Sequence, residues 1–235
     1  MAVLLLIWQG AALLSAPDLL PGPGVTVAAM GKALFQGDML FHVGVTLARV
    51  AAAFLIAMAI GTAIGIALGM SRRIDRFFEF WLLLFLNLPA LVTIILCYLW
   101  FGLTEAAAVA AVAINKIPNV AVTLREGSRA LDPKLMEMAR AFRMGPVKTL
   151  HVVILPQLAP YLSAAARGGL SLIWKIVLVV ELLGRGSGVG FQLHLFFQLF
   201  DVTNILAYSL AFILVIQMID HGLFQPVERH INRWR

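Results

Sequence analysis

The side chains in this sequence that are best suited to chemistry are ionisable or amide groups placed inside strongly apolar segments. Lys116 is the clearest case, because it lies near the middle of an apolar run, within residues 115–119, beside Pro118. A charge at the centre of a bilayer costs about 2.5–3.5 kcal/mol on insertion scales. Three interpretations of Lys116 stay open: it attracts an anion, it pairs with an acid such as Glu181, or its ammonium group extends to the membrane surface.

Other polar groups lie nearer the ends of apolar runs. Arg49 and Arg167 are predicted to be structural residues at the membrane surfaces that border their segments. Glu181 either meets water at the outer end of its segment or lies beside a polar path through the membrane. Both a structural and a functional role are compatible with Trp174-Lys175.

Nucleotide, metal and disulfide chemistry find no support in the residue patterns. The motif G-x-x-x-x-G-K-[ST] is absent, because the one Gly-Lys pair, Gly31-Lys32, is followed by Ala33. The glycine-rich stretch 184–190 does not fit G-x-G-x-x-G and is predicted to be a flexible turn outside the cytoplasm. The five histidines lack metal-binding spacing, and the single cysteine, Cys97, excludes an intramolecular disulfide. We therefore expect no catalytic residue, no metal site and no cofactor bound by this chain.

The elements that carry these residues are predicted to be membrane-spanning helices. With 61% hydrophobic and 13% charged residues and a mean hydropathy of +0.93, the 235-residue chain has too little polar surface to coat a soluble globule. We expect an all-α membrane protein with one domain over residues 1–235. About six runs are long enough to cross a bilayer: 2–20, 43–70, 80–101, 105–124, 152–182 and 203–224.

The first run is predicted to be a retained span rather than a cleaved signal peptide, because no basic residue precedes its apolar stretch. Four prolines inside or at the edges of the runs are predicted to kink their helices: Pro89, Pro118, Pro156 and Pro160. Glycines at 61, 65 and 69 share one helical face, where another helix can approach closely. Packing within the chain is favoured over a subunit interface. Residues 21–40 are predicted to form a turn and then an amphipathic surface helix.

Lysine and arginine are distributed unevenly between the predicted loops. Of the 18 such residues, Arg49, Lys116, Arg167 and Lys175 lie within spans, and Lys32 and Arg185 lie in one set of loops. The other twelve lie in the alternate set: Arg72, Arg73, Arg76, Arg125, Arg129, Lys134, Arg140, Arg143, Lys148, Arg229, Arg233 and Arg235. Because positive residues are retained in the cytoplasm, this set and both termini are predicted to be cytoplasmic. The asymmetry accounts for the net charge of +6 without a nucleic-acid partner.

A polar, helix-favouring segment interrupts the apolar runs between residues 126 and 150. Asp132-Pro133 is typical of an N-cap and first helical position. The apolar residues that follow recur at three- and four-residue steps, which predicts one apolar stripe: Leu135, Met138, Ala139 and Phe142. Gly145 and Pro146 are predicted to end this helix and begin another. A helix kept out of the lipid in this way is suited to binding a soluble partner.

The pattern Glu137-x-Ala139, followed by an apolar run that ends in Leu155-Pro156, resembles the "EAA" cytoplasmic loop of permease subunits of binding-protein-dependent ABC importers. Counting back from Leu155-Pro156, the glycine usual in that loop falls on Arg143, and the nearest glycine is Gly145. Further residues resemble the nitrate, sulfonate and taurine branch of that family: Ser71-Arg72-Arg73, Leu88-Pro89, Trp100-Phe101-Gly102, Glu181 and the final Arg-Trp-Arg.

This resemblance implies a type I ABC importer permease fold in the bacterial inner membrane. It implies two ATPase subunits that use ATP and Mg²⁺, a second permease copy forming a homodimer, a periplasmic substrate-binding protein and the surrounding lipid as partners. The loop of about residues 126–150 would hold the coupling helices that contact the ATPase. The implied coupling residues are Leu135, Glu137, Ala139, Arg140, Phe142, Arg143 and Gly145.

The resemblance further implies alternating access of a small solute, with a sulfonate, taurine, nitrate or similar anion as the substrate. The translocation pathway is then expected to be lined by polar groups of the spans: Asn87, Asn115, Lys116, Trp174, Lys175 and Glu181.

Two other classes of protein remain as alternatives. An ion-coupled secondary transporter or channel would need no ATP, but it is expected to place an acid deep in a span, and the span acids here lie near span ends. A membrane assembly protein with a DNA-binding helix-turn-helix in its basic loop would bind duplex DNA in a salt-dependent manner.

Overall fold

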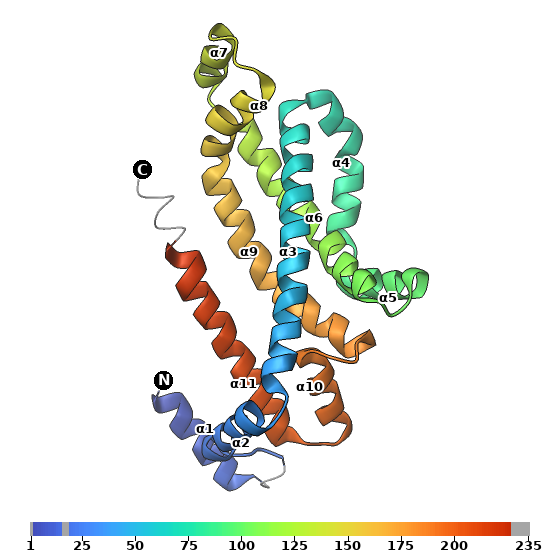
Figure 1. Cartoon of the computed structure of the whole chain (residues 1–235), viewed down its shortest axis with the longest axis vertical. Coiled ribbons are helices and arrows are strands. Elements are labelled where there is room, and N and C mark those ends of the chain that lie inside the picture. The colour runs from blue at the N-terminus through green and yellow to red at the C-terminus, as the bar shows by residue number, and fades with distance from the viewer. Residues whose placement is uncertain (1, 16–18, 227–235) are drawn as a thin grey trace. The chain divides into compact units, whose positions relative to one another are not determined.

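The structure, a computed structural model, describes residues 2–15 and 19–226, and these are helical with no strand among them. The helices are α1 (Ala2–Leu14), α2 (Pro23–Gln36), α3 (Met39–Met70), α4 (Arg72–Asn87), α5 (Ala90–Phe101), α6 (Glu105–Arg129), α7 (Pro133–Ala141), α8 (Pro146–Thr149), α9 (Leu155–Gly184), α10 (Val189–Gln198) and α11 (Val202–Ile219), with π-helical turns η1 (Leu150–Ile154) and η2 (Asp220–Phe224). Figure 1 shows their order along the chain. Arg229, Arg233 and Arg235, and with them the Arg-Trp-Arg end, lie outside the described residues.

Fewer helices than expected satisfy the length and composition of a membrane span. Among the described residues, three do so: α3, α6 and the helix over Val202–Gly222. Helices α4 and α5 qualify only as a pair, bent by 94°. The expected count of six is therefore corrected to three, or four with the bent pair. The predicted run 2–20 contains only the short α1, and α9 carries Arg167, Lys175 and Glu181.

The predicted span 80–101 is broken at Leu88-Pro89, and the break has a local cause. Leu88 is extended (φ −66°, ψ 124°), as expected for a residue whose helical conformation is disfavoured by a following proline. The Asn87 side-chain amide donates a hydrogen bond to the Leu83 carbonyl (2.7 Å), which satisfies one acceptor at the end of α4. Pro89 then caps α5, so the sequence ends one helix and begins the next within two residues.

The chain folds into two compact units. The first combines residues 1–49 with 177–223, and the second combines 50–176 with 224–235, so that α3 and α9 each contribute to both. The expectation of one permease domain over residues 1–235 stays a prediction.

Close packing of α3 on α6 forms the centre of the second unit. A Cβ atom added at Gly61 would lie 2.6 Å from Val120 Cβ, and one added at Gly65 would lie 2.6 Å from Leu124 Cβ. Gly69 makes an equally close approach to Ser128. The predicted glycine face is confirmed, and it packs within the chain. Next to it, α6, η1 and α9 form an apolar core of Val120, Leu124, Ile154, Leu158 and Ala165.

The first unit contains the predicted surface helix. Helix α2 begins after Pro21-Gly22, with Pro23 at its first position, so the expected turn and helix within 21–40 are confirmed. The Trp8 indole N–H donates to the Pro21 carbonyl (3.1 Å) and ties α1 to this turn. Helix α2 packs against α11, and α11 packs against α10.

Candidate functional site

Helix α7 begins as the sequence predicts. The Asp132 carboxylate accepts a hydrogen bond from the Lys134 backbone N–H (2.8 Å), and Pro133 occupies the first turn. The Asp132 backbone N–H donates to Gln157 Oε1 (2.8 Å), which fixes the start of α7 to the first turn of α9. The segment that joins α6 to α9 therefore begins and ends within the second unit. Figure 1 shows α7 and α8, which lie in this segment, beyond the ends of α6 and α9.

The end of α7 is closed by a Schellman turn with an arginine at its left-handed position. Arg143 has φ +50°. The Met144 N–H donates to the Ala139 carbonyl (2.9 Å) and the Arg143 N–H donates to the Arg140 carbonyl (2.9 Å), which are the two bonds of that motif. Gly145 instead has φ −64° and precedes α8 as its N-cap. The turn therefore forms at the position where the resemblance places a glycine, and Gly145 does not provide it.

The apolar stripe of α7 is divided between two environments. Leu135, Met138 and Phe142 are 39%, 41% and 76% exposed, whereas Ala139 is only 2% exposed. Helix α7 packs against η1, where Val153 is also buried. The expectation that Ala139 itself contacts a partner is therefore corrected, because its side chain is covered by this chain. Glu137 and Arg140 are exposed beside the three apolar side chains.

An ion-pair network fixes α4 to α6 near this loop. The Asp75 carboxylate contacts Arg125 Nη1 (3.2 Å) and, through its other oxygen, Arg129 Nη2. Glu126 contacts both arginines as well, at 3.2 Å each. Residues 72–79 form the first two turns of α4, so Asp75 is presented to α6 from a regular helix. The i, i+4 spacing of Arg125 and Arg129 on α6 is a signal that could have indicated a shared partner.

Lys116 is almost fully covered within the second unit. Its side chain is 5% exposed, and its Cε would lie 2.9 Å from a Cβ atom at position 169, so the stem lies directly across Gly169 of α9. Among the described residues, Lys116 forms no ion pair or hydrogen bond. Glu181 belongs to the other unit, so the alternative of a pair between Lys116 and Glu181 stays a prediction.

The other predicted pathway residues differ in their environments. Asn87 is exposed and bonded to its own helix, and Asn115 is half-buried, with its backbone carbonyl accepting from Asn119 Nδ2 at 3.4 Å. Trp174 is 5% exposed, whereas the neighbouring Lys175 is exposed. The structure thus brings Lys116 against α9 but gives Asn87 and Lys175 no buried polar environment.

Glu181 is at the centre of a buried cluster in the first unit, and its expected contact with water is corrected. Its side chain is 0% exposed, and its Oε1 accepts from Arg49 Nη1 at 2.7 Å. Thr46 Oγ1 lies 2.9 Å from both carboxylate oxygens, and the Gly190 N–H donates to Oε2 at 2.8 Å. Arg49, predicted to be at a membrane surface, is itself buried by this pairing. Both carboxylate oxygens of Glu181 therefore have hydrogen-bond donors from its own unit.

The glycine-rich stretch after Glu181 is held in place rather than left free. Arg49 donates to the Ser187 carbonyl (2.7 Å) and to Ser187 Oγ (3.0 Å), and the Gly188 N–H donates to His42 Nδ1 (3.0 Å). Gly188 has φ +110°, and a Cβ atom there would overlap the Glu181 carboxylate. Sequence reasoning missed His42 and Thr46, although both share a face with Arg49 at i, i+4 and i+7 in an otherwise apolar helix.

The chain is similar in sequence to a family of known transport proteins. Residues 57–220 match the family described as "Binding-protein-dependent transport system inner membrane component". This chain belongs to that family. The permease is 30% identical to the putative aliphatic sulfonates transport permease SsuC of Escherichia coli (strain K12), over 92% of this chain and 82% of the relative. It is 29% identical to the protein of the same description from Bacillus subtilis (strain 168), over 100% and 85%, and 24% identical to the taurine transport system permease TauC of E. coli, over 100% and 87%.

The fold of the permease is also that of solved importers. The inward-facing MetNI methionine ABC transporter matches with a TM-score of 0.73 at 17% identity, over 83% of this chain and 96% of that chain. An amino acid ABC transporter with histidines matches with a TM-score of 0.63 at 23% identity, over 82% and 93%. The expected all-α, type I importer permease fold is confirmed. Membership in this family favours an ATP-driven importer over the ion-coupled transporter and the DNA-binding assembly protein.

Proposed function

We propose that this permease is one of two identical membrane subunits of an importer that takes up a small anion, driven by two separate ATPase subunits and supplied by a periplasmic binding protein. The family description supports the binding protein, and the sequence lacks the phosphate-binding motif that an ATPase needs. ATP and Mg²⁺ would then be used by the partner subunits. The pairing of two identical copies follows the resemblance stated above.

The exposed stripe of α7 is the observation that carries the proposal. Leu135, Met138 and Phe142 present apolar side chains, flanked by Glu137 and Arg140, on a helix that projects from the ends of α6 and α9 (Figure 1). Apolar anchors surrounded by charged groups are typical of a helix that docks in a groove of a partner. We propose that this face binds the ATPase and that Ala139, buried beneath it, positions the helix.

The hairpin is proposed to face the cytoplasm. Arg72, Arg73 and Arg76 lie at the start of α4, and Arg140, Arg143 and Lys148 lie in the α7–α8 loop, which is the accumulation of positive charge expected on that side. Both termini are proposed to lie on the same side. In the proposed mechanism, ATP binding closes the two ATPases, the docked hairpins move with them, and the spans alternate between inward-open and outward-open states.

A sulfonate or a similar small anion is the proposed substrate. The relatives named above are described as aliphatic sulfonate and taurine permeases. Lys116 supports an anionic substrate, because a buried ammonium group without a partner among the described residues is stabilised by an anion that lies beside it. We propose Lys116 as a pathway residue. Asn115, its neighbour in sequence, and Trp174, which is also buried, are proposed to belong to the same pathway. Glu181 is proposed to be structural, since its oxygens are already occupied.

The docking face is tested by changing Phe142, the C-cap of α7 and the most exposed of the three apolar side chains. Phe142→Asp places a charge where the partner's apolar surface is expected, so both co-purification with the ATPase and ATP-dependent uptake in reconstituted vesicles should fall at least about tenfold, the loss expected for a hot-spot anchor. Phe142→Leu keeps an apolar side chain and should retain most of both activities.

Size-exclusion behaviour and helix content of the purified variants serve as the check on folding. Because Phe142 makes little contact with its own chain, both variants should fold as the wild type does. If Phe142→Asp still binds the ATPase and supports uptake as Phe142→Leu does, α7 is not the coupling surface and the proposal fails.

A further inference from the structure

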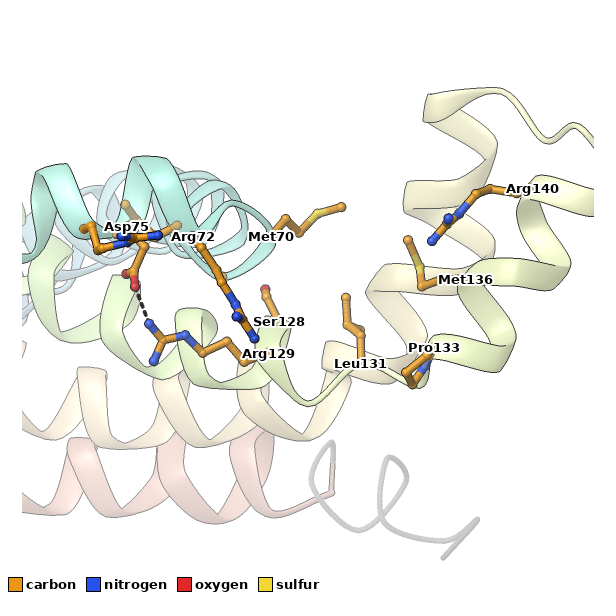
Figure 2. Close-up of a pocket in the computed structure, with 12 residues that line it drawn as sticks. Met70, Arg72, Asp75, Ser128, Arg129, Leu131, Pro133, Met136 and Arg140 are labelled. Atoms are coloured by element: carbon orange, nitrogen blue, oxygen red, sulfur yellow. Dashed lines mark hydrogen bonds and ion pairs between the residues drawn. The ribbon is translucent and has the colours of Figure 1, made fainter.

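A cavity of about 750 Å³ lies at the junction of α3 and α4, the end of α6 and the start of α7. Its volume is within the range of about 300–1,000 Å³ that is typical of small-molecule sites. The ion pairs described above border it, but neither they nor the exposed stripe of α7 fill it. Figure 2 shows Arg72 and Arg129 on one side of this cavity and Arg140 on the other.

The lining of the cavity carries an excess of positive charge. Four guanidinium groups, those of Arg72, Arg76, Arg129 and Arg140, line it together with a single carboxylate, that of Asp75. Asp75 is already shared between Arg129 and Arg125. Among the residues that the structure describes, Arg72, Arg76 and Arg140 form no ion pair. Three separate helices, α4, α6 and α7, therefore direct like charges to one space.

A second, independent feature of the lining is an unsatisfied hydroxyl group. Ser128 is 5% exposed, lines the cavity, and its Oγ has no hydrogen-bond partner within the described part of the chain. Buried hydroxyl groups in native proteins are nearly always bonded, and an exception calls for a ligand or a solvent molecule at that position. A Cβ atom added at Gly69 would lie 2.4 Å from Ser128 Cβ and 3.3 Å from its Oγ, so α3 packs directly against this side chain.

We propose that this cavity binds an oxyanion of the phosphate or sulfonate type, presented by a membrane lipid headgroup or by a small solute. Guanidinium groups bind such oxyanions through paired N–H donors, and the Ser128 hydroxyl adds one further donor. The anion would neutralise the repulsion between the arginines and hold the start of α7 against α4 and α6. This inference rests on the cavity and its lining, and it does not depend on the proposed coupling to an ATPase.

The test uses the full-length permease in nanodiscs of phosphatidylcholine. Inorganic phosphate or sulfate is titrated at low ionic strength, where charge interactions are least screened, and the thermal unfolding temperature is recorded. A parallel set of nanodiscs contains phosphatidylglycerol, and native mass spectrometry counts the lipids retained. The double variant Arg72→Gln/Arg76→Gln removes two charges that line the cavity. The control is Arg73→Gln, which removes a neighbouring exposed charge that does not line the cavity.

The double variant should weaken anion binding at least about tenfold, the loss expected for one or more charged hydrogen bonds, while Arg73→Gln keeps wild-type binding. Stabilisation by the soluble anions in phosphatidylcholine supports a solute ligand, and stabilisation only with phosphatidylglycerol supports a lipid headgroup. Ser128→Ala should weaken the same response without removing a charge. If the double variant and Arg73→Gln respond equally, or if the wild type responds to neither source, the proposal is overturned.

Discussion

Arg143 holds a backbone conformation that few residues other than glycine adopt readily. Its φ of +50° allows the two hydrogen bonds that close α7, and its guanidinium group stays exposed. The geometry of the turn is therefore set by backbone hydrogen bonds rather than by the Arg143 side chain. The left-handed position raises the free energy of the turn without contributing a contact of its own.

Replacing Arg143 with glycine is expected to stabilise this turn by up to about 1 kcal/mol, because glycine lacks the steric penalty of the left-handed conformation. The amide protons of Arg143 and Met144 should then exchange with solvent up to about fivefold more slowly in a hydrogen-exchange experiment. Arg140→Gly is the control with the opposite sign, since glycine inside α7 destabilises the helix by about 1 kcal/mol. Equal or faster exchange in Arg143→Gly would contradict the assigned turn.

The Arg49–Glu181 pair is a second feature that belongs to single residues. Arg49→Met leaves a buried, unpaired carboxylate and is expected to cost about 3–5 kcal/mol of unfolding free energy. The double variant Arg49→Met/Glu181→Met removes both charges and should regain much of that loss. The measurement is reversible unfolding in detergent micelles. A double variant as unstable as the sum of its two single variants would mean that the two groups do not interact.

At the scale of helices, the sequence predicts the features that depend on local neighbours and leaves open those that depend on tertiary packing. The N-cap of α7, the helix after Pro21-Gly22 and the glycine face of α3 depend on neighbours within about one turn, and each was predicted correctly. The partner of Glu181 depends on how α3 and the last turns of α9 are aligned, which no local pattern encodes. The exposure of Ala139 likewise depends on η1, a segment that periodicity does not identify.

The charged residues show the same difference between what local sequence predicts and what tertiary packing decides. The i, i+4 pair Arg125 and Arg129 was assigned to the cytoplasmic side by counting, yet counting alone does not reveal that Asp75 lies between them. The cavity beside Ser128 likewise depends on the tertiary packing of four helices, α3, α4, α6 and α7. Sequence reasoning therefore located the candidate coupling helix and the buried lysine, and tertiary packing decided which side chains of each are available to a partner.

The close approach of α3 and α6 makes Gly65 the sharpest test at this scale. In Gly65→Ala the new Cβ would lie 2.6 Å from Leu124 Cβ and 2.7 Å from the Ala121 carbonyl oxygen, so one of the helices must move. We expect a loss of about 1–3 kcal/mol, as for other overpacked sites, measured as a lower thermal unfolding temperature. Gly44→Ala, in the same helix, meets nothing within 4 Å and should be neutral or slightly stabilising. Equal stabilities of the two variants would disprove close packing at Gly65.

For the whole molecule, the cost of membrane insertion depends on whether charged side chains are paired. A count of charged residues in the sequence does not show such pairing. Arg49 on α3 and Glu181 on α9 form an ion pair with no net charge, so α9 carries fewer uncompensated charges than its sequence suggests. Length and composition identify three spans, or four with the bent α4–α5 pair, whereas the fold matches importers of the type I class. Lys116 differs from this pair, because it is buried and no group in the described part of the chain compensates its charge.

Variants of Lys116 therefore test whether the substrate of the assembled importer is an anion. In proteoliposomes with the ATPase and binding protein, Lys116→Gln is expected to lower the uptake of taurine or an alkyl sulfonate at least about tenfold at subsaturating substrate, because a charged hydrogen bond to the anion is lost. Lys116→Arg keeps the charge and should retain part of the uptake, limited by the tight fit against Gly169. Lys32→Gln, which removes an exposed charge from α2, is the control and should transport as the wild type does.

The pattern across these three variants separates an electrostatic role of Lys116 from a packing role. If the ammonium group attracts the anion, uptake follows charge, so that Lys116→Arg exceeds Lys116→Gln. If the stem alone matters, as a filler between α6 and Gly169, the bulkier arginine is the worse substitution and glutamine the better one. If Lys116→Gln transports better than Lys116→Arg, Lys116 is removed from the proposed pathway. The only buried cation that favours an anionic substrate among the described residues is then removed with it.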